Sequence, residues 1–292
     1  MDSKENKRVY MIISIVIIII LSIFIIVVIR DINGKSSKQI KASYNFLRIL
    51  ENDNGISQEK DIKINDFKDV ERISDFSNIK YTLANNDYVF ELNEDYQVIG
   101  FFEQNVKKLY GVKELTSEEC KRYSKKYLNS IYKEDVVFKE IKDKDVEENP
   151  FYTFTYYKMH NDYICYSSEI WVNISKYDGS LVGYSNYSEG NGEFLSNINI
   201  NEDESKNIFF NYMKELGVVG EIVNKPKIGY FNIDGDVNQI CYLINYRITE
   251  EDNKIKFSDV IINADTGDIV KHSNNIVELL PNENNISNEK KD

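Results

Sequence analysis

The chain has 292 residues, of which 29% are charged and 13% aromatic, and its formal net charge is −12. This acidic excess argues against a nucleic-acid partner, because phosphate binding needs a basic surface. Three cysteines that lie far apart do not predict a disulfide framework.

The first predicted element is an uncharged run of twenty-one residues, from Val9 to Ile29. As a helix it would span roughly 30 Å, the thickness of a bilayer core. No small-residue cleavage site follows, which favours a retained transmembrane helix over 9–29 and not a signal peptide. Because long bodies translocate largely regardless of charge, we expect a cytoplasmic tail over 1–8 and a single-pass cell-membrane protein whose bulk is extracytoplasmic.

Residues 30–110 are predicted to begin with a juxtamembrane helix and to end in a β-hairpin. Ile40, Leu47 and Leu50 recur at helical spacing. The hairpin over 90–100 lacks the glycine found in two later hairpins and is one residue shorter. We therefore interpret this segment as a degenerate N-terminal unit.

Two helices further along the chain begin with the same capping box, an N-cap residue three positions before a glutamate. Thr116 precedes Glu119, and Asn201 precedes Glu204. Apolar residues then recur at helical spacing, which predicts that both helices are amphipathic. These residues are Cys120, Tyr123, Tyr127, Leu128 and Ile131 in the first helix, and Ile208, Phe209, Tyr212, Met213 and Leu216 in the second.

Strands and a hairpin are predicted after each of these helices. Residues 240–248 alternate with a period of two, as a strand requires, and 151–158 form the equivalent stretch. Each hairpin contains a glycine, Gly179 or Gly267, where a tight turn needs a residue that tolerates positive φ.

The predicted fold class is therefore α+β: an N-terminal transmembrane helix followed by tandem units of one helix packed on a small antiparallel sheet. The units cover 111–191 and 192–275. Residues 276–292 have no apolar periodicity and are predicted to form a disordered tail.

The residues that could support catalysis are few. Neither His160 nor His272 lies in a metalloprotease, serine-hydrolase or phosphate-binding motif. Residues 232–238 place oxygen ligands at alternate positions, but the glycine comes too early for an EF-hand loop, which favours a solvated hairpin turn. We expect no enzymatic activity, no cofactor and no metal site.

Three segments resemble a PepSY domain of the YcdB/YcdC type, in which a helix precedes a small antiparallel sheet that ends in a hairpin. They are 115–128, 154–164 and 171–184. Residues 200–272 are similar to a second copy, with Asp-Thr-Gly-Asp-Ile at 265–269 as the closer match. The plan of one span and tandem repeats also resembles the YpeB and YycI families. This resemblance implies domains that bind, inhibit or protect partner proteins.

The strand over 151–157 carries aromatic side chains on both faces. One helix covers only one face of a sheet, so the aromatic residues of the other face must meet a sibling unit, the N-terminal segment or another protein. Packing between units and a partner-binding surface are both open alternatives. For the second, the candidate partner-binding residues are Tyr152, Tyr156, Tyr157, Tyr163 and Tyr166.

Two functions fit these observations. The first is a membrane-anchored extracytoplasmic regulatory protein that binds and modulates a cell-envelope partner, such as a peptidase, a wall hydrolase or a sensor kinase. The second is an extracytoplasmic receptor domain for a small ligand or a peptide.

Overall fold

The computed structural model describes residues 38–277 except 57–62, 72–74, 107, 110, 143–147, 188–191, 234, 236 and 250–253. The predicted cytoplasmic tail and transmembrane helix lie outside the described residues, as does all of the predicted C-terminal tail beyond residue 277. Within the described part of the chain, no helix has both the length and the apolar character needed to cross a bilayer.

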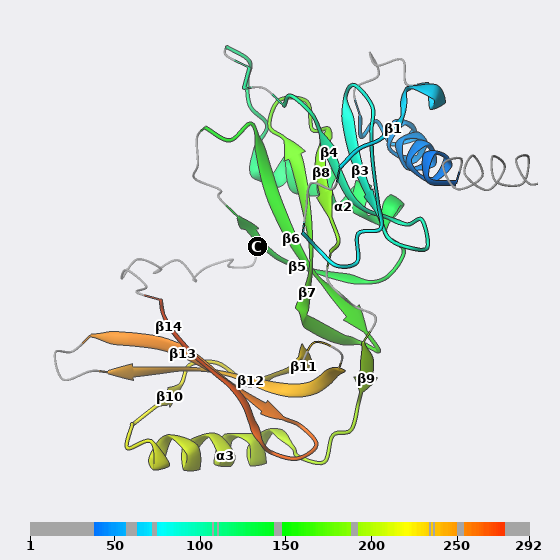
Figure 1. Ribbon diagram of the computed structural model, residues 1–292. Helices are drawn as coiled ribbons and strands as arrows, with labels where there is room; N and C mark the ends of the chain where they lie inside the picture. The colour runs from blue at the N-terminus through cyan, green and yellow to red at the C-terminus, as the bar shows by residue number, and fades with distance from the viewer. Residues whose placement is uncertain are drawn as a thin grey trace, which may run out of the picture. The chain divides into compact units, whose positions relative to one another are not determined.

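The described residues form three α-helices and a succession of strands (Figure 1). The helices cover residues 38–52, α2 (Ser117–Ile131) and α3 (Glu202–Glu215), and a short 3-10 helix, η1, covers Ile64–Asp66. The strands are β1 (Lys68–Asp69), β2 (Tyr81–Ala84), β3 (Tyr88–Leu92), β4 (Val98–Glu103), β5 (Val136–Lys142), β6 (Phe151–His160), β7 (Tyr163–Ser175), β8 (Leu181–Ser185), β9 (Glu193–Leu195), β10 (Glu221–Ile222), β11 (Lys227–Asn232), β12 (Val237–Thr249), β13 (Ile255–Asn263) and β14 (Ile269–Val277).

These strands are hydrogen-bonded into one 14-stranded sheet. Its main path is β1-β2-β3-β4-β8-β7-β11-β12-β13-β14, while β5 pairs with β6, β6 with β7, and both β9 and β10 with β12. The sheet is mixed, because β7 pairs parallel with β11 and β9 pairs parallel with β12.

The prediction of tandem units that each contain a separate small antiparallel sheet is therefore wrong. The physical reason lies in β7, whose thirteen residues extend beyond one small sheet. Its C-terminal part pairs with β8, and its N-terminal part pairs with β11. A small sheet would leave edge strands with unpaired backbone N–H and C=O groups, and these extra pairings satisfy them.

The chain divides into two compact units, and each is assembled from three segments. Unit 1 consists of Met1–Lys133, Glu140–Thr155 and Trp171–Tyr187, and unit 2 consists of Glu134–Lys139, Tyr156–Ile170 and Ser188–Asp292. The strands β5, β6 and β7 each contribute residues to both units. The boundaries predicted from sequence similarity, at 110/111 and 191/192, stay a prediction.

The core of unit 1 is an aromatic cluster between the helix over 38–52 and the sheet. The ring of Phe46 lies 5.3 Å from that of Phe101 and 6.0 Å from that of Tyr184. Phe90 lies 5.4 Å from Phe101 and is fully buried. All five residues of β3 are buried, so both faces of this strand are covered.

The core of unit 2 lies between α3 and one face of β12 and β13, as Figure 1 shows. Phe209 and Met213 of α3 are buried in it, and the Phe209 ring lies 5.2 Å from the Tyr246 ring. The predicted period-two strand is confirmed by β12, whose alternate residues Ile240, Tyr242, Ile244 and Tyr246 all belong to this core.

Both predicted capping boxes are confirmed. The backbone N–H of Glu119 donates to Thr116 Oγ1 at 3.3 Å, and the backbone N–H of Thr116 donates to the Glu119 carboxylate at 2.8 Å. The corresponding distances for Asn201 and Glu204 are 3.0 Å and 2.8 Å. Each box satisfies N–H groups that a helix start would otherwise leave without partners.

The predicted hairpin glycines are also confirmed, since Gly179 has a φ of 73° and Gly267 a φ of 82°. In the shorter hairpin between β3 and β4, Tyr96 takes the positive φ, at 63°. The Asn93 N–H donates to the Gln97 carbonyl and closes this turn. The turn is one residue shorter than the turns of the two glycine hairpins. The degenerate hairpin therefore keeps the left-handed position without the glycine that usually occupies it.

Candidate functional site

The five candidate tyrosines lie in different surroundings. Tyr152, in unit 1, is half-buried beside Phe154, with Lys176 Nζ 4.8 Å from its ring centroid. Burial raises the pKa of its hydroxyl. Tyr156, in unit 2, is 3% exposed and packs edge-on against Phe138 at 5.7 Å. Tyr156 is a core residue.

The other three tyrosines belong to unit 2, and the structure brings two of them together. Tyr157 and Tyr166 are half-buried, and their rings meet edge-to-face at 5.3 Å. Tyr166 also stacks on Phe231 at 4.9 Å with an interplanar angle of 22°. Tyr163 is separate from this pair and meets Tyr230 at 6.1 Å, against the core beside α3.

The alternation of β7 places the Tyr166 side chain on the sheet face opposite to α3. Its neighbour Cys165 belongs to the core beside α3, and adjacent side chains of a strand point to opposite faces. The Tyr166 ring lies close to Gly229, where a Cβ atom would be 2.6 Å from the ring. The absence of a side chain at Gly229 therefore gives the ring its position.

A charged pair borders the Tyr157 ring. Lys139 Nζ donates to the Glu169 carboxylate at 2.7 Å and lies 5.1 Å from the centroid of the Tyr157 ring. Burial alone would lower the pKa of Lys139, but the hydrogen bond to Glu169 and the Tyr157 hydroxyl outweigh it and raise the pKa. Lys139 thus stays charged beside the aromatic pair, which we call the tyrosine pair from here on.

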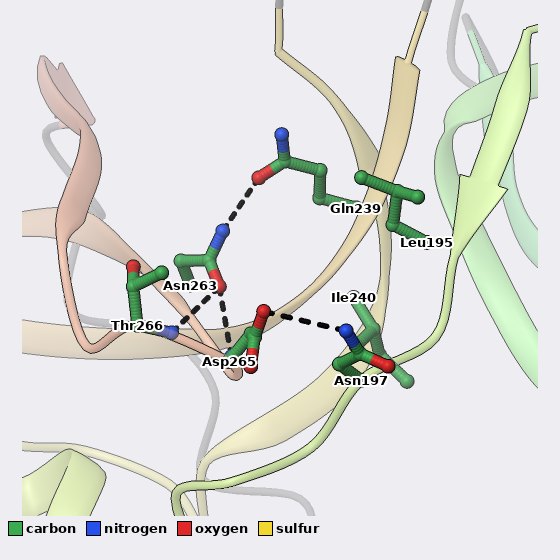
Figure 2. Close-up of a pocket in the computed structure, with 7 residues that line it drawn as sticks. All are labelled: Leu195, Asn197, Gln239, Ile240, Asn263, Asp265 and Thr266. Carbon is green, nitrogen blue, oxygen red and sulfur yellow. Dashed lines mark hydrogen bonds between the residues drawn. The ribbon is translucent and has the colours of Figure 1, made fainter.

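A second candidate site in unit 2 is a pocket with a volume of about 230 Å³ (Figure 2). Three parts of the chain form it: the end of β9 with the segment that follows, the start of β12, and the end of β13 with the turn to β14. Its lining residues are Leu195, Asn197, Gln239, Ile240, Asn263, Asp265 and Thr266.

Backbone pairing and a turn motif position these side chains. The parallel pairing of β9 with β12 places Leu195 opposite Gln239. In the turn, Asn263 Oδ1 accepts hydrogen bonds from the backbone N–H groups of Asp265 at 2.8 Å and Thr266 at 3.1 Å. In such a turn, an asparagine side chain accepts a hydrogen bond from the backbone N–H two residues later in the chain. This contact fixes the start of the loop.

Hydrogen bonds from asparagine side chains orient the Asp265 carboxylate and the Gln239 amide group in the pocket. Asn199 Nδ2 donates to one Asp265 oxygen at 2.5 Å, and Asn197 Nδ2 approaches the other at 3.5 Å. Asn263 Nδ2 donates to Gln239 Oε1 at 2.5 Å. Figure 2 shows the contacts of Asn197 and Asn263, with the amide nitrogen of Gln239 directed away from Asn263.

The sequence did not predict this pocket. From the sequence, residues 263–268 are predicted only as part of a hairpin, and Gln239 lies outside the predicted strand over 240–248. The available signal was the alternation of three asparagines, Asn197, Asn199 and Asn201, ahead of α3. Asparagine in such a segment frequently makes side-chain hydrogen bonds, but the pattern does not say with which element.

The other groups with reactive potential have structural surroundings. Burial raises the pKa of Cys120 and Cys165 to about 11 and that of Cys241 to about 12, so these thiols stay protonated near neutral pH. The His160 ring stacks on Phe194, and His272 lies between the hydroxyls of Tyr212 and Tyr246. Among the described residues, no group of three or more His, Cys, Asp and Glu side chains is placed to hold a metal ion.

Comparison with known proteins finds similarity among solved structures only. No family model matches the chain, and no curated protein matches it in sequence. Among solved structures, the C-terminal domain of YpeB from Bacillus megaterium is similar, with a TM-score of 0.47 and 16% sequence identity over 71% of this chain and 88% of that chain. This neighbour is of the YpeB type, not the YcdB/YcdC type. Membership of the PepSY family stays a prediction.

Proposed function

We propose that this protein is a non-catalytic regulatory protein, anchored by one N-terminal helix, whose extracytoplasmic body binds and modulates a protein of the cell envelope. A peptidase, a wall hydrolase or a sensor kinase is the class of partner we propose. The observation that supports the proposal is the tyrosine pair, Tyr157 and Tyr166, on the sheet face opposite to α3.

The tyrosine pair has the properties of an interface anchor. Each ring is held by another ring, so little conformational freedom would be lost on binding. Tyrosine combines a large apolar ring with a polar hydroxyl, and it is enriched at protein interfaces. The pair between Lys139 and Glu169 supplies a charged border, as interface rims usually have.

The test is site-specific cross-linking in the full chain in its native membrane. A photoreactive amino acid replaces Tyr157, and we expect one cross-linked protein adduct. The further substitution Tyr166→Ala should lower the adduct yield about tenfold or more, because removing a central aromatic anchor costs roughly 2 kcal/mol of binding.

The matched control is Phe210→Ala, which removes an aromatic ring that is 49% exposed on α3 in the same unit. This control should leave the adduct unchanged. The unfolding midpoint of each variant is measured in parallel. An unchanged adduct in Tyr166→Ala, or an equal loss in Phe210→Ala, contradicts binding through the tyrosine pair. Lower stability of Tyr166→Ala without loss of the adduct means that the ring only packs internally.

A second candidate function is that of a receptor for a small ligand or a peptide. The pocket beside Asp265 favours it, because its polar groups come from three chain elements and converge on one cavity. The two functions use different residues of unit 2 and are therefore testable separately.

A further inference from the structure

The pocket beside Asp265 has the charge of a site for a cationic group. Of the seven described residues that line it, Asp265 alone carries a charge, and the rest are amide, hydroxyl or aliphatic side chains. An anionic ligand would be repelled by this carboxylate, whereas an ammonium group would both bind it and neutralise it.

The Asp265 carboxylate is oriented in advance and has capacity left. Two asparagine amides, from Asn197 and Asn199, approach its two oxygens. An ionised carboxylate has about four acceptor positions, so roughly two remain for a ligand. Because the amide donors fix the side chain, little reorganisation is needed when an ammonium group binds.

The amide network also defines which atoms the pocket offers to the rest of a ligand. Asn263 Oδ1 binds the turn backbone, so its Nδ2 donates to Gln239 Oε1. The Gln239 amide nitrogen then lies on the opposite side of its group and can donate to a ligand carbonyl. Asn197 Nδ2 points to Asp265, which turns Asn197 Oδ1 away as an acceptor (Figure 2).

The apolar part of the lining sets the size of the ligand. Leu195 and Ile240 provide an aliphatic wall. The volume of about 230 Å³ is smaller than the several hundred Å³ of sites for drug-sized molecules, so one amino-acid-sized group fits. An ammonium group, a nearby carbonyl and a short aliphatic side chain occur together at the N-terminus of a peptide. A lysine side chain has no carbonyl close to its ammonium group.

We infer that this pocket binds the free N-terminus of a peptide with a small aliphatic first residue. The α-ammonium group contacts Asp265 and Asn197, the first carbonyl accepts from Gln239, and the aliphatic side chain lies against Leu195. The inference rests on the receptor function proposed above and names its ligand class. It does not depend on the tyrosine pair.

The test uses the full chain in lipid nanodiscs and calorimetric titration with leucine amide, which carries the ammonium group, the carbonyl and an aliphatic side chain. We expect saturable 1:1 binding with a Kd on the order of 1 mM or tighter, since so small a ligand has few atoms to contribute. N-acetyl-leucine amide, which lacks the ammonium group, should bind at least about tenfold more weakly.

Matched variants locate the site. Asp265→Asn keeps the shape of the side chain but removes its charge, and should weaken leucine amide about tenfold or more. The control, Asp268→Asn, removes the same charge from the same turn. Asp268 accepts a hydrogen bond from Thr266 Oγ1 but does not line the pocket, so this variant should change the Kd less than twofold.

The outcomes separate the ligand class from the receptor function. Equal binding of both amides, or equal effects of the two aspartate variants, overturns the N-terminus assignment and leaves a receptor for another ligand. No saturable binding of either amide to a folded protein, as judged by circular dichroism, overturns the assignment and removes the support for the receptor function.

Discussion

Two hairpin turns, one in each unit, share a backbone plan and differ in what covers them. The first turn runs from Ser175 to Ser180, and the second from Asn263 to Asp268. Both close with an N–H to carbonyl hydrogen bond of 2.9 Å between their end residues. In both, the residue before the helix N-cap donates its N–H to the second residue of the turn, Leu115 to Lys176 and Ile200 to Ala264.

The difference between the turns lies in the side chains from the covering helix. Above the first turn lies the Tyr123 ring, and the Tyr127 hydroxyl donates to the Gly179 carbonyl at 3.1 Å. Above the second turn lie the ends of two aliphatic side chains, from Ile200 and Ile208. In the second turn, Asp265 and Thr266 line a pocket. In the first, Ser175, Lys176 and Ser180 are all buried.

This comparison shows that one backbone motif can serve as a closed structural joint or as the wall of a cavity. Two rings pack near the first turn and a hydroxyl binds its carbonyl. Ser175, Lys176 and Ser180 of this turn are buried, whereas Asp178 is exposed. Aliphatic ends lie near the glycine of the second turn, and Asp265 and Thr266 of this turn line the pocket. Three pairs of substitutions test this contrast, and the largest expected effect comes first.

Valine at the turn glycines should distinguish the aromatic cover of the first turn from the aliphatic cover of the second. At Gly179 a Cβ atom would lie 2.7 Å from the Tyr123 ring, in addition to the strain of positive φ. At Gly267 the nearest atom is the movable end of Ile200, at 2.8 Å. We expect Gly179→Val to destabilise its unit by about 3 kcal/mol and Gly267→Val by about 1–2 kcal/mol, measured by denaturant unfolding.

The control for backbone strain alone is Gly217→Val. Gly217 has a φ of 69°, close to that of Gly179, and nothing lies within 4 Å of its Cβ position. Its cost should be about 1 kcal/mol. Trp171, the single tryptophan, reports on unit 1, and circular dichroism reports on both units. Equal costs at Gly179 and Gly267 contradict the distinction between the two covers.

The tyrosine hydroxyls that follow the glycines give a smaller contrast. Tyr127 is 1% exposed, and its hydroxyl contacts the carbonyls of Gly179 and Asn54, each at 3.1 Å. We expect Tyr127→Phe to cost about 1–2 kcal/mol of unfolding free energy, because buried carbonyls lose a donor. Burial also raises the pKa of this hydroxyl, so it remains a donor at neutral and mildly alkaline pH.

Tyr212 occupies the equivalent helix position, eleven residues after the N-cap, and its hydroxyl meets His272 Nδ1 at 3.1 Å. Because Tyr212 is only half-buried, water can replace the lost contact in Tyr212→Phe, and the cost should stay below about 1 kcal/mol. Thermal or denaturant unfolding of both variants measures the difference. A larger cost at Tyr212 than at Tyr127 would reverse the comparison.

The local parts of this arrangement could be predicted from the sequence, because neighbours along the chain determine them. The capping boxes at Thr116 and Asn201 and the positive φ of Gly179 and Gly267 are of this kind. The helix stripes are correct in part. Tyr127, Leu128, Phe209 and Met213 are buried, whereas Leu216, the last residue of the second predicted stripe, is 48% exposed beyond the end of α3.

The long-range parts could not be predicted, because no local pattern specifies them. The parallel pairing of β7 with β11 joins residues that are 65 positions apart, Ile164 and Gly229. The pocket needs Asn197, Gln239 and Asp265 to converge from three elements. Among the five tyrosines, only the fold distinguishes the buried Tyr156 from the half-buried Tyr157.

The smallest expected contrast is a dependence of stability on pH. It concerns the fourth position of each turn, where the first turn has Asp178 and the second has Thr266. Asp178 Oδ1 accepts hydrogen bonds from Ser180, from its backbone N–H at 3.1 Å and from its hydroxyl at 2.8 Å. Burial alone would raise the pKa of Asp178, but the hydrogen bonds from Ser175 and Ser180 outweigh it and lower the pKa below its usual value.

A folded-state pKa below the unfolded one means that Asp178 contributes stability above the unfolded pKa of about 4, and that this contribution is lost as the pH falls through the lower folded-state value. We expect Asp178→Asn to cost less than about 1 kcal/mol at pH 7 and less again at pH 3, because the contribution of the carboxylate declines once the pH falls below the unfolded pKa of about 4. Urea unfolding followed by Trp171 fluorescence at both pH values measures this change. Ser180→Ala, which removes the hydroxyl donor, should show the same decrease in cost. Thr266→Ser in the second turn keeps the hydroxyl that donates to Asp268 and should cost the same at both pH values. A cost of Asp178→Asn that does not change between pH 7 and pH 3 would mean that the amide replaces the carboxylate fully, and that the two turns differ in packing alone.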